Sequence, residues 1–591
     1  TLQNAASGAC LTTANNATAN DTRAVLGACT AASARWTVLA TPTGGTPVSE
    51  VVTSSPIAPT TAPLPGEVSE PVASAAPELP RVTIDTRMPT PTGRTIAVPA
   101  GGDLQGALDA AQPGDVITLA NGATYRGNFV LGAKAPGGWI VVRPASLSGL
   151  PAEGERLAPA RHAAAMPKIV SPNGMFALAT PDAQSGKKTH GWRFVGLEIA
   201  SNEAVDVAQT LIELGNTNER TLAALSSHFV FDRVWIHGRT TQHVHRCLAI
   251  NAAHAAVIDS YFSDCHTRGG EGQVIAGWQT PGPVKIQNNY LEGGTIGVLF
   301  GGADPWISGM IPSDIEVRGN HFLKPLTWKG VWSAKNGFEL KNAQRVLVEG
   351  NVFENNWMDA QAGYMILFTP LSQSNLAPWT TVRDVTFRHN LLRNSAQGFM
   401  ISSRNAYGAN ATPLTDVTRR VLIEHNVLER VGGRAFLVSN ELQDVTIAHN
   451  VVSNSEYVSL LLVGDSTNAP AQRLVFRDNL VGRGYMLVSG DGTGEGRVAL
   501  NAYARDAVIA GNLAYSTVAP GVGRTDLYPT TNAFVADAAL AGITSGTING
   551  VVVPRAQVSS LSAFFRSGTG GTTPGADLAA VARATATAVQ R

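Results

Sequence analysis

The sequence predicts an all-β chain built around a right-handed parallel β-helix, a solenoid of stacked coils that begins with a capping helix. Three observations indicate this fold: a motif of apolar residues and Asn that recurs along most of the chain, a short amphipathic helix just before the repeats, and a composition of 60 glycines with only 15% charged residues. That composition is too apolar for a disordered chain and suits many strands joined by turns.

The repeat has the form apolar-x-apolar-x-x-Asn-x-apolar, as in VKIQNNYL from residue 284 and VLVEGNVF from residue 346. Alternate apolar residues should face the inside of each coil. Asn should occupy the bend that follows, because Asn tolerates a left-handed backbone and can hydrogen-bond to adjacent coils. Earlier copies carry Val234 and Ser260 at the Asn position. We expect the asparagines to form one stacked ladder: Asn289, Asn320, Asn351, Asn390, Asn426, Asn450, Asn479 and Asn512.

The chain divides into four parts by composition. Residues 1–40 form a small disulfide-closed β module, and residues 41–94 form a linker rich in Pro, Thr and Ser that should be extended. Residues 95–560 carry the repeats, and residues 561–591 form a C-terminal cap or tail. The capping helix is expected over residues 103–111, where it would shield the open end of the first coil.

Charge and cysteine content narrow the class of protein. Lys+Arg and Asp+Glu are both 44, so no net basic field exists to attract nucleic acid, and no apolar run is long enough to span a bilayer. The chain begins at Thr1 without Met, as expected after removal of a leader. The four cysteines form two local pairs, Cys10/Cys29 and Cys247/Cys265, which favours an oxidising, extracellular setting. For the second pair, a disulfide and two buried thiols both remain open.

Each coil carries a second strand whose outward position is unusually apolar. An outward column of this kind should be covered by long loops, by the linker or by a partner chain. A partner chain at this place would make the rod a self-associating or protein-binding structure. The predicted column consists of Ile275, Leu299, Glu339, Ile366, Met400, Leu437, Leu461 and Met486.

Glu339 is the single charged residue in that column, and Lys335 and Lys341 lie close to it in the sequence. A carboxylate in an apolar row is a candidate for a shifted pKa and therefore for acid–base catalysis. The alternative is a buried Glu–Lys pair that only fixes the register of a covering loop.

A second group of polar residues precedes the regular repeats. His243 and His245 should lie on one side of a strand, as a pair of metal ligands would. Asp264, His266 and Glu271 are candidates to line a sugar-binding cleft or to transfer protons. The alternative is that all five are packing residues of turns.

The capping helix and the Asn-laddered coils resemble the pectate-lyase-like β-helix superfamily over residues 95–560. Stretches such as GPVKIQNNYLEGG and FELKNAQRVLVEGNVFENNW are similar to a bacterial group of secreted β-helix proteins of unassigned activity. Residues 1–40 resemble one subdomain of a ricin-type lectin through Cys10, Cys29 and Trp36, although the Q-x-W motif is absent. The superfamily resemblance implies polysaccharide lyases or hydrolases that use calcium-bound carboxylates with an Arg or Lys base, or paired carboxylates. Neither set matches a column of this sequence.

Two functions follow as hypotheses. The first is a secreted, carbohydrate-active β-helix protein at the cell surface or outside a bacterial cell, which binds and cleaves an extracellular polysaccharide as a lyase or hydrolase. The second is a non-catalytic rod that assembles into a surface layer, filament or complex. The sequence leaves open the glycan, the metal, the partner and whether the chain is an enzyme.

Overall fold

The computed structural model describes residues 74–589 apart from 203, 404–414, 465–469 and 518–523, together with four short strands near the N-terminus. Those strands form an antiparallel sheet in the order β3-β2-β1-β4. The predicted pairing of Cys10 with Cys29 lies outside the described residues, because Cys29 is not among them. The bounds of the four strands are β1 (Leu2–Asn4), β2 (Cys10–Thr13), β3 (Ala24–Val25) and β4 (Trp36–Thr37).

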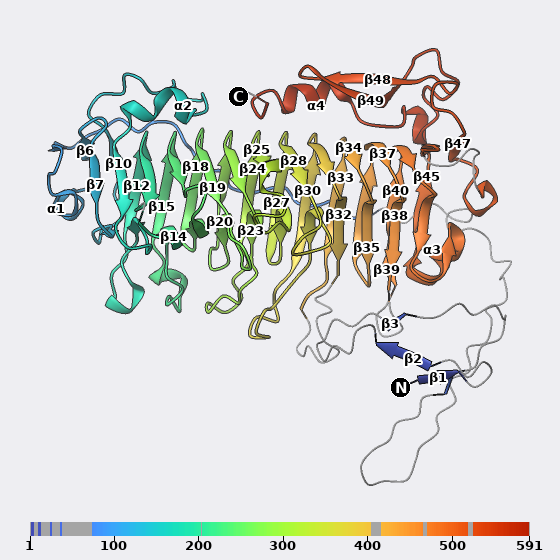
Figure 1. Ribbon diagram of the computed structural model, residues 1–591, viewed down its shortest axis with the longest axis horizontal. Helices are drawn as coiled ribbons and strands as arrows, with labels where there is room; N and C mark the ends of the chain where they lie inside the picture. Colours follow the sequence, from blue (N-terminus) through green and yellow to red (C-terminus); the bar gives the residue numbers. More distant parts are fainter. Residues whose placement is uncertain are drawn as a thin grey trace, which may run out of the picture. The chain divides into compact units, whose positions relative to one another are not determined.

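The larger unit, from residue 64 onward, winds through three parallel sheets, and each coil adds one strand to each sheet (Figure 1). The chain leaves sheet I at the Asn bend, enters sheet II, turns sharply into sheet III and returns to sheet I through longer loops. This winding brings residues 24 to 39 positions apart into adjacent coils, as in the hydrogen bonds between successive ladder asparagines.

The strands have the following bounds. Sheet I contains β5 (Thr95–Val98), β6 (Val116–Leu119), β9 (Ile140–Pro144), β12 (His190–Val195), β15 (Ser227–Asp232), β18 (Ala253–Ile258), β21 (Val284–Gln287), β24 (Ser313–Arg318), β27 (Ala343–Glu349), β30 (Val382–Arg388), β33 (Arg419–Glu424), β36 (Gln443–Ala448), β39 (Ala471–Gln472), β40 (Val475–Arg477), β44 (Ala504–Arg505) and β45 (Val508–Ala510). Sheet II contains β7 (Thr124–Arg126), β10 (Lys168–Ser171), β13 (Glu198–Ser201), β16 (Trp235–His237), β19 (Tyr261–Cys265), β22 (Tyr290–Gly293), β25 (His321–Leu323), β28 (Val352–Asn356), β31 (Leu391–Ser395), β34 (Val427–Val431), β37 (Val451–Ser455), β41 (Leu480–Arg483), β46 (Leu513–Tyr515) and β47 (Ala533–Val535). Sheet III contains β8 (Phe129–Val130), β11 (Leu178–Ala179), β14 (Val207–Leu214), β17 (His243–Ile250), β20 (Gln273–Gly277), β23 (Ile296–Phe300), β26 (Asn336–Leu340), β29 (Tyr364–Phe368), β32 (Gln397–Ser402), β35 (Arg434–Ser439), β38 (Val458–Val463), β42 (Met486–Gly490) and the antiparallel β43 (Gly494–Glu495).

Helices are short and lie at the ends and corners of the coils. The predicted capping helix is present as α1, in which Asp103 is the N-cap and accepts the Gly106 N–H at 2.8 Å. Its buried Leu104 and Leu108 close the first coil, because they pack into the continuous core. The helices are α1 (Leu104–Ala110), α2 (Pro159–His162), α3 (Arg497–Tyr503) and α4 (Leu578–Ala584), with single turns η2 (Ala163–Ala165), η3 (Ala183–Ser185), η4 (Leu222–Ala224), η5 (Leu326–Trp328), η6 (Thr525–Leu527) and η7 (Thr569–Gly571).

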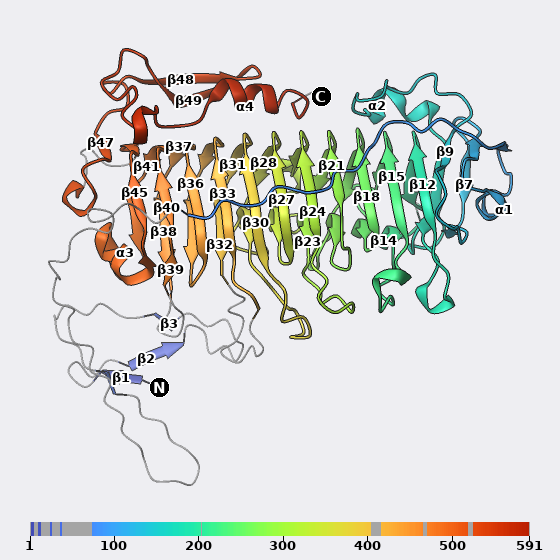
Figure 2. The ribbon, with the colours of Figure 1, turned by 180° about the vertical axis from the view of Figure 1, so that it is seen from behind.

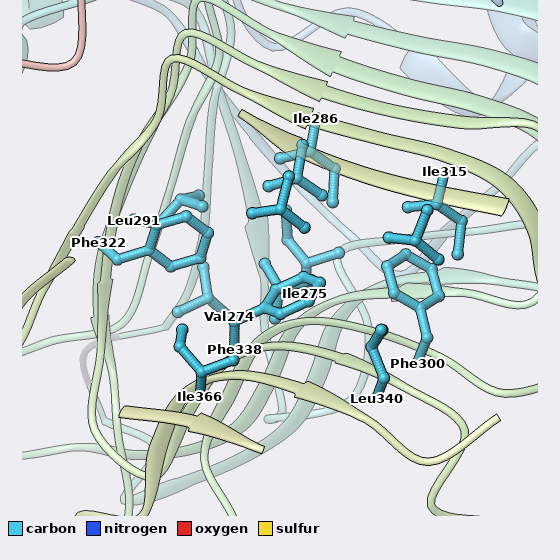
Figure 3. Close-up of a cluster of buried hydrophobic side chains, with 14 of the residues drawn as sticks. Val274, Ile275, Ile286, Leu291, Phe300, Ile315, Phe322, Phe338, Leu340 and Ile366 are labelled. Carbon is cyan, nitrogen blue, oxygen red and sulfur yellow. The ribbon is translucent and has the colours of Figure 1, made fainter. Parts of the chain in front are cut away.

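The core fills the inside of the coils with apolar side chains from all three sheets. Figure 3 shows Ile275 and Ile366 among these side chains, packed with Phe338. In the strand register, Ile275 pairs with Val298, and Phe338 pairs with Ile366. The prediction that Ile275 and Ile366 face outward is therefore wrong.

The outward column of sheet III lies one residue further along at these strands. Two consecutive residues, Val274 and Ile275, face the core before Ala276 faces out, so an alternation counted from the sequence slips by one position. Met486 pairs with Val458 rather than with Leu461, so it lies outside the register of the column, although it packs against the same outer cluster as Leu437 and Leu461. The observed column is Ala249, Ala276, Leu299, Glu339, Leu367, Met400, Leu437, Leu461 and Ser489.

This column is covered within the chain. Leu299, Leu437 and Leu461 are each at most 9% exposed. The described part of the linker does not provide this cover, because residues 74–94 cross the outer face of sheet I instead (Figure 2). Little apolar surface therefore remains on the column for a partner chain.

The ladder asparagines hydrogen-bond from coil to coil. The N–H and Nδ2 of Asn351, for example, both donate to Oδ1 of Asn390, at 2.8 and 3.0 Å. The series continues beyond Asn512 to Asn532, which the repeat motif does not reveal. The left-handed backbone predicted for Asn is instead adopted by the residue before it, such as His389 with φ 54°. The Asn side chain therefore hydrogen-bonds to the adjacent coils, and the residue before it adopts the left-handed backbone of the bend.

The coils end before the predicted boundary at residue 560. The last parallel pairing joins β46 to β47, so the final coil ends at Val535. β48 (Ile543–Ile548) and β49 (Val551–Val558) form an antiparallel hairpin that lies with α4 along sheet II (Figure 1). This cap buries outward apolar residues of sheet II, among them Leu391, Val427 and Leu480.

Three histidines at the left-handed positions of successive bends stack against one another under this cap. His389, His425 and His449 have ring centroids 5.6 and 5.0 Å apart. The N–H of Asp577 donates to Nδ1 of His425 at 3.2 Å, which requires that nitrogen to be unprotonated. Burial, and then the neighbouring His449 and His389, lower the pKa of His425 to about 4.

We expect acid to destabilise the fold through His425. The unfolded chain binds this proton near pH 6.5 but the native chain only near pH 4, so the free energy of unfolding falls as the pH is lowered through that window. After allowance for partial exposure, the loss is about 2 kcal/mol. Urea midpoints at pH 7 and pH 5 should show a smaller pH effect for His425→Gln than for the wild type. An equal effect in both would contradict the assignment.

Candidate functional site

Two carboxylates and two ammonium groups lie together on the outer face of sheet III. β26 places Glu339 in the outward column between two leucines of adjacent strands. Lys341 directly follows β26, and its Nζ lies 3.2 Å from Glu339 Oε1. Lys335, just before β26, places its Nζ 2.6 Å from Oε1 of Glu271, just before β20. We call these four residues the Glu–Lys cluster.

Gln273 of the same coil as Glu271, and Arg246 of the preceding coil, extend the cluster. Gln273 Nε2 donates to Glu271 Oε2 at 2.8 Å, and Arg246 Nε donates to Gln273 Oε1 at 2.9 Å. Arg246 and Gln273 are direct neighbours in the strand register. Gln273 therefore binds one carboxylate oxygen of Glu271 while Lys335 binds the other. The pairing of β17 with β20 places Arg246 beside Gln273.

The two carboxylates have opposite pKa shifts. Burial raises the pKa of Glu339 above its ordinary value, and the ion pair with Lys341 only partly opposes this. Burial also acts to raise the pKa of Glu271, but the ion pair with Lys335 and the charge of Lys341 outweigh it and hold this pKa below its ordinary value. Two acidic groups whose pKa values are driven apart are typical of catalytic sites.

Access from solvent differs among the four groups. The side chain of Glu339 is 1% exposed, whereas Lys341 is 16%, Lys335 is 18% and Glu271 is 40% exposed. A polymer can touch Glu271 and the lysines but not Glu339. Glu339 is therefore placed to position Lys341 rather than to contact a substrate.

One tryptophan flanks the cluster, and a second is exposed on a loop that leaves sheet III. Trp278 packs on Leu299, the neighbour of Glu339 in the outward column, and the Arg246 guanidinium lies 5.1 Å from the Trp278 ring. Trp306, on the loop after β23, is 55% exposed, and its N–H donates to Gln279 Oε1 at 2.7 Å. Exposed tryptophan beside charged groups suits the apolar faces and hydroxyls of a sugar.

The other predicted residues lie at the corner between sheets II and III. His266 is fully buried, its ring stacks on Trp332 at 3.9 Å, and its Nε2 lies 3.4 Å from Asp264 Oδ1. His243 Nδ1 accepts the Arg268 N–H at 3.4 Å. His245 Nδ1 lies 3.2 Å from the backbone oxygen of Glu271. These contacts join His245 to the Glu–Lys cluster and leave Asp264 and His266 in an aromatic corner.

The predicted histidine pair does not gain further ligands. Among residues 74–589, as far as the structure describes them, no group of three or more His, Cys, Asp or Glu is placed to hold a metal ion. The calcium-bound carboxylates that the superfamily resemblance implies are therefore not matched by these residues. Cys247 and Cys265 are joined by a disulfide inside the coils, which resolves the alternative left open by the sequence.

A cavity of about 560 Å³ lies elsewhere, on the outer face of sheet I. Four of its charged side chains form ion pairs: Arg193 lies 2.6 Å from Asp232, and Arg318 pairs with Glu349. None of the predicted site residues lines this cavity. The Glu–Lys cluster is therefore the better candidate site.

No pattern in the sequence marks Gln273 or Trp278 as residues of the candidate site. Their roles depend on register, since Gln273 lies beside Arg246, and Trp278 directly follows β20 on the outer face. An alignment of HVHRCLAI with QVIAGW in the observed register would reveal the pair Arg246–Gln273.

Residues 246–476 match the protein-family model of the right handed beta helix region. The coiled part of this chain is a right-handed parallel β-helix. The fold class predicted from the sequence, a right-handed parallel β-helix, is thereby confirmed. None of the helices in the described part of this β-helix protein is long and apolar enough to cross a membrane.

Solved structures similar to this β-helix protein include a PL6 family alginate lyase, AlyGC, with 14% identity, a TM-score of 0.37, and coverage of 82% of this chain and 58% of that chain. Pectate lyase Pel9A has 14% identity, a TM-score of 0.27, and coverage of 82% and 96%. The PL6 family polysaccharide lyase Pedsa3628 from Pseudopedobacter saltans has 12% identity, a TM-score of 0.30, and coverage of 74% and 92%. The chain thus spans less than two thirds of the alginate lyase. Similarity at this level carries no information on chemistry. No curated protein matches the sequence significantly.

Proposed function

We propose that this β-helix protein acts outside the cell on an acidic polysaccharide, which it binds across the outer face of sheet III and cleaves at the Glu–Lys cluster. The observation that carries the proposal is the arrangement of Glu271, an accessible carboxylate with a lowered pKa, beside Lys335 and Lys341. The disulfide between Cys247 and Cys265 supports the extracellular location.

The charges near the cluster favour an anionic ligand. Lys335, Lys341 and Arg246 are cationic, whereas the raised pKa of Glu339 reduces its negative charge. Within the Glu–Lys cluster, Glu271 is the exposed carboxylate that would repel a carboxylate of the polymer, and Lys335 compensates its charge directly. Cationic groups on an outward face attract and orient a uronic acid chain.

The cleavage that fits best is β-elimination. That reaction needs a base to remove the proton next to the sugar carboxylate, and cations to stabilise the anion that forms. In the proposed step Glu271 takes this proton, and Lys335 and Lys341 stabilise the anion. The anion then forms a carbon–carbon double bond as the glycosidic C–O bond on the adjacent carbon breaks, and the released oxygen takes up a proton from water. A hydrolase would need an accessible proton donor, whereas the only carboxyl of the cluster with a raised pKa, Glu339, is enclosed.

The test compares acidic and neutral polysaccharides in calorimetric binding and in the ultraviolet absorbance of an unsaturated product. We expect binding of polyuronates, about tenfold weaker binding for Lys335→Met, and retained binding without product for Glu271→Gln. Lys329→Met is the matched control, because Lys329 is exposed on the same loop and has the same charge. Equal binding by Lys335→Met and Lys329→Met would overturn the proposed site.

The alternative of a non-catalytic assembling rod is supported less well. The apolar column that suggested a partner surface is buried within the chain, as Leu299 and Leu461 show. Failure to bind any polysaccharide, together with concentration-dependent assembly in light scattering, would favour that alternative.

A further inference from the structure

The segment before the first coil, residues 74–94, crosses the outer face of sheet I from coil to coil (Figure 2). Its backbone N–H groups donate to aspartates at every third residue. Ala75 donates to Asp444 Oδ1 at 3.2 Å. Glu78 and Arg81 donate to Asp384 Oδ1 and Asp314 Oδ1, at 3.2 and 2.8 Å respectively.

The acceptors belong to a ladder in which aspartate and arginine alternate from coil to coil. All members have a left-handed backbone and occupy equivalent places at the start of the sheet I strands. Each arginine pairs with the aspartate of the preceding coil, at 2.8, 2.6 and 2.7 Å. Aspartates therefore recur every second coil. The ladder is Asp314, Arg345, Asp384, Arg420, Asp444 and Arg473.

The two repeats match in length. Two coils rise by about 9.6 Å, and one turn of a polyproline II helix, three residues, rises by about 9.3 Å. A threefold helix returns its N–H to the same side at every third residue, whereas the twofold repeat of a β-strand would point alternate donors away. Burial has the same period, because Ser74, Pro77 and Pro80 are half-buried and the residues between them are exposed.

The sequence of the linker carries this period as well. Seven of the nine prolines between residues 41 and 80 share the three-residue phase of Pro77 and Pro80: Pro47, Pro56, Pro59, Pro65, Pro71, Pro77 and Pro80. Among the described residues, Pro77 and Pro80 directly precede the donors Glu78 and Arg81, so neither proline removes a donor N–H. Composition alone would place prolines in all three phases.

We propose that the Asp–Arg ladder is a docking surface for polyproline II peptides, and that residues 74–82 are its resident ligand. The ladder recognises a backbone N–H at every third residue, with proline or a small residue immediately before it. Because each aspartate is already neutralised by an arginine, the surface selects helical geometry rather than charge. Docking determines where the linker leaves the coils, near β36.

Two proline substitutions in the full chain test this recognition. Glu78→Pro and Leu79→Pro both create a second proline beside an existing one and favour polyproline II geometry. Only Glu78→Pro removes an N–H that reaches the ladder. In the wild type, the amides of Ala75, Glu78 and Arg81 should exchange at least about tenfold more slowly than those of Ala76, Leu79 and Val82.

Glu78→Pro should abolish the protection of Ala75 and Arg81 and raise the rate of tryptic cleavage after Arg81 by about tenfold. Leu79→Pro should leave both unchanged. Exchange within β24 and β30 serves as the control for intact coils. Uniform exchange along the wild-type segment, or equal effects of the two substitutions, would overturn the proposal.

Discussion

Replacing Asn390 with alanine should lower the free energy of unfolding by about 3–5 kcal/mol. Its Oδ1 accepts from the N–H and Nδ2 of Asn351, and its Nδ2 donates to Val348 O and to Asn426 Oδ1, all between 2.8 and 3.0 Å. These groups lie inside the protein, where water cannot replace the lost partners. The substitution therefore leaves several buried polar groups unsatisfied at once. Denaturant unfolding followed by circular dichroism measures the effect.

Asn501→Ala is the matched control for this experiment. Asn501 is exposed on α3, and alanine is the better helix former, so the stability should change by a few tenths of a kcal/mol at most, in the stabilising direction. A loss below about 1 kcal/mol for Asn390→Ala would mean that the ladder contributes much less than its hydrogen bonds suggest.

Lys341→Met should lower the free energy of unfolding by about 3 kcal/mol at neutral pH, because it leaves Glu339 buried without its partner. The loss should shrink in acid. Burial raises the folded pKa of Glu339 above its unfolded value, so the stability contributed by protonation is fully present below the unfolded pKa and is lost as the pH rises through the folded pKa. Unfolding measured at about pH 4.5 and at about pH 7.5 tests this sign.

The double variant Glu339→Leu/Lys341→Met completes the cycle. Leu fits the column because the neighbours of Glu339 in adjacent strands are Leu299 and Leu367. The double variant should regain most of the stability that Lys341→Met loses. If it does so and also retains polysaccharide binding, the pair has a structural role only; recovered stability with lost binding would place Lys341 in the site.

Much of the fold can be predicted from local sequence pattern. The Asn positions and the apolar residues on either side recur within eight-residue motifs, so each motif specifies its strand, its bend and its inward residues without reference to distant chain. The helix at Leu104–Ala110 is predicted for the same reason, because its cap and apolar spacing are local. The prediction is wrong where alternation is interrupted, as at Val274 and Ile275, where two successive side chains face the core.

The candidate site is predicted in part. Glu339, Lys341, Lys335 and Glu271 are all named from the sequence, and the structure brings them together. Their pairing, and the enclosure of Glu339, depend on how loops of different length align β20 with β26, which no local pattern encodes.

The coiled all-β architecture, the positions of the ladder asparagines and the charged residues on an apolar face can be predicted from local pattern, because each depends on spacing within a single coil. The stacked coils are needed to show which outward residues are neighbours, that the linker lies on sheet I and that the C-terminal hairpin covers sheet II. Those contacts join residues up to 372 positions apart. Their geometry arises from the stacking of many coils, in which a one-residue change of register moves a side chain from the core to the surface.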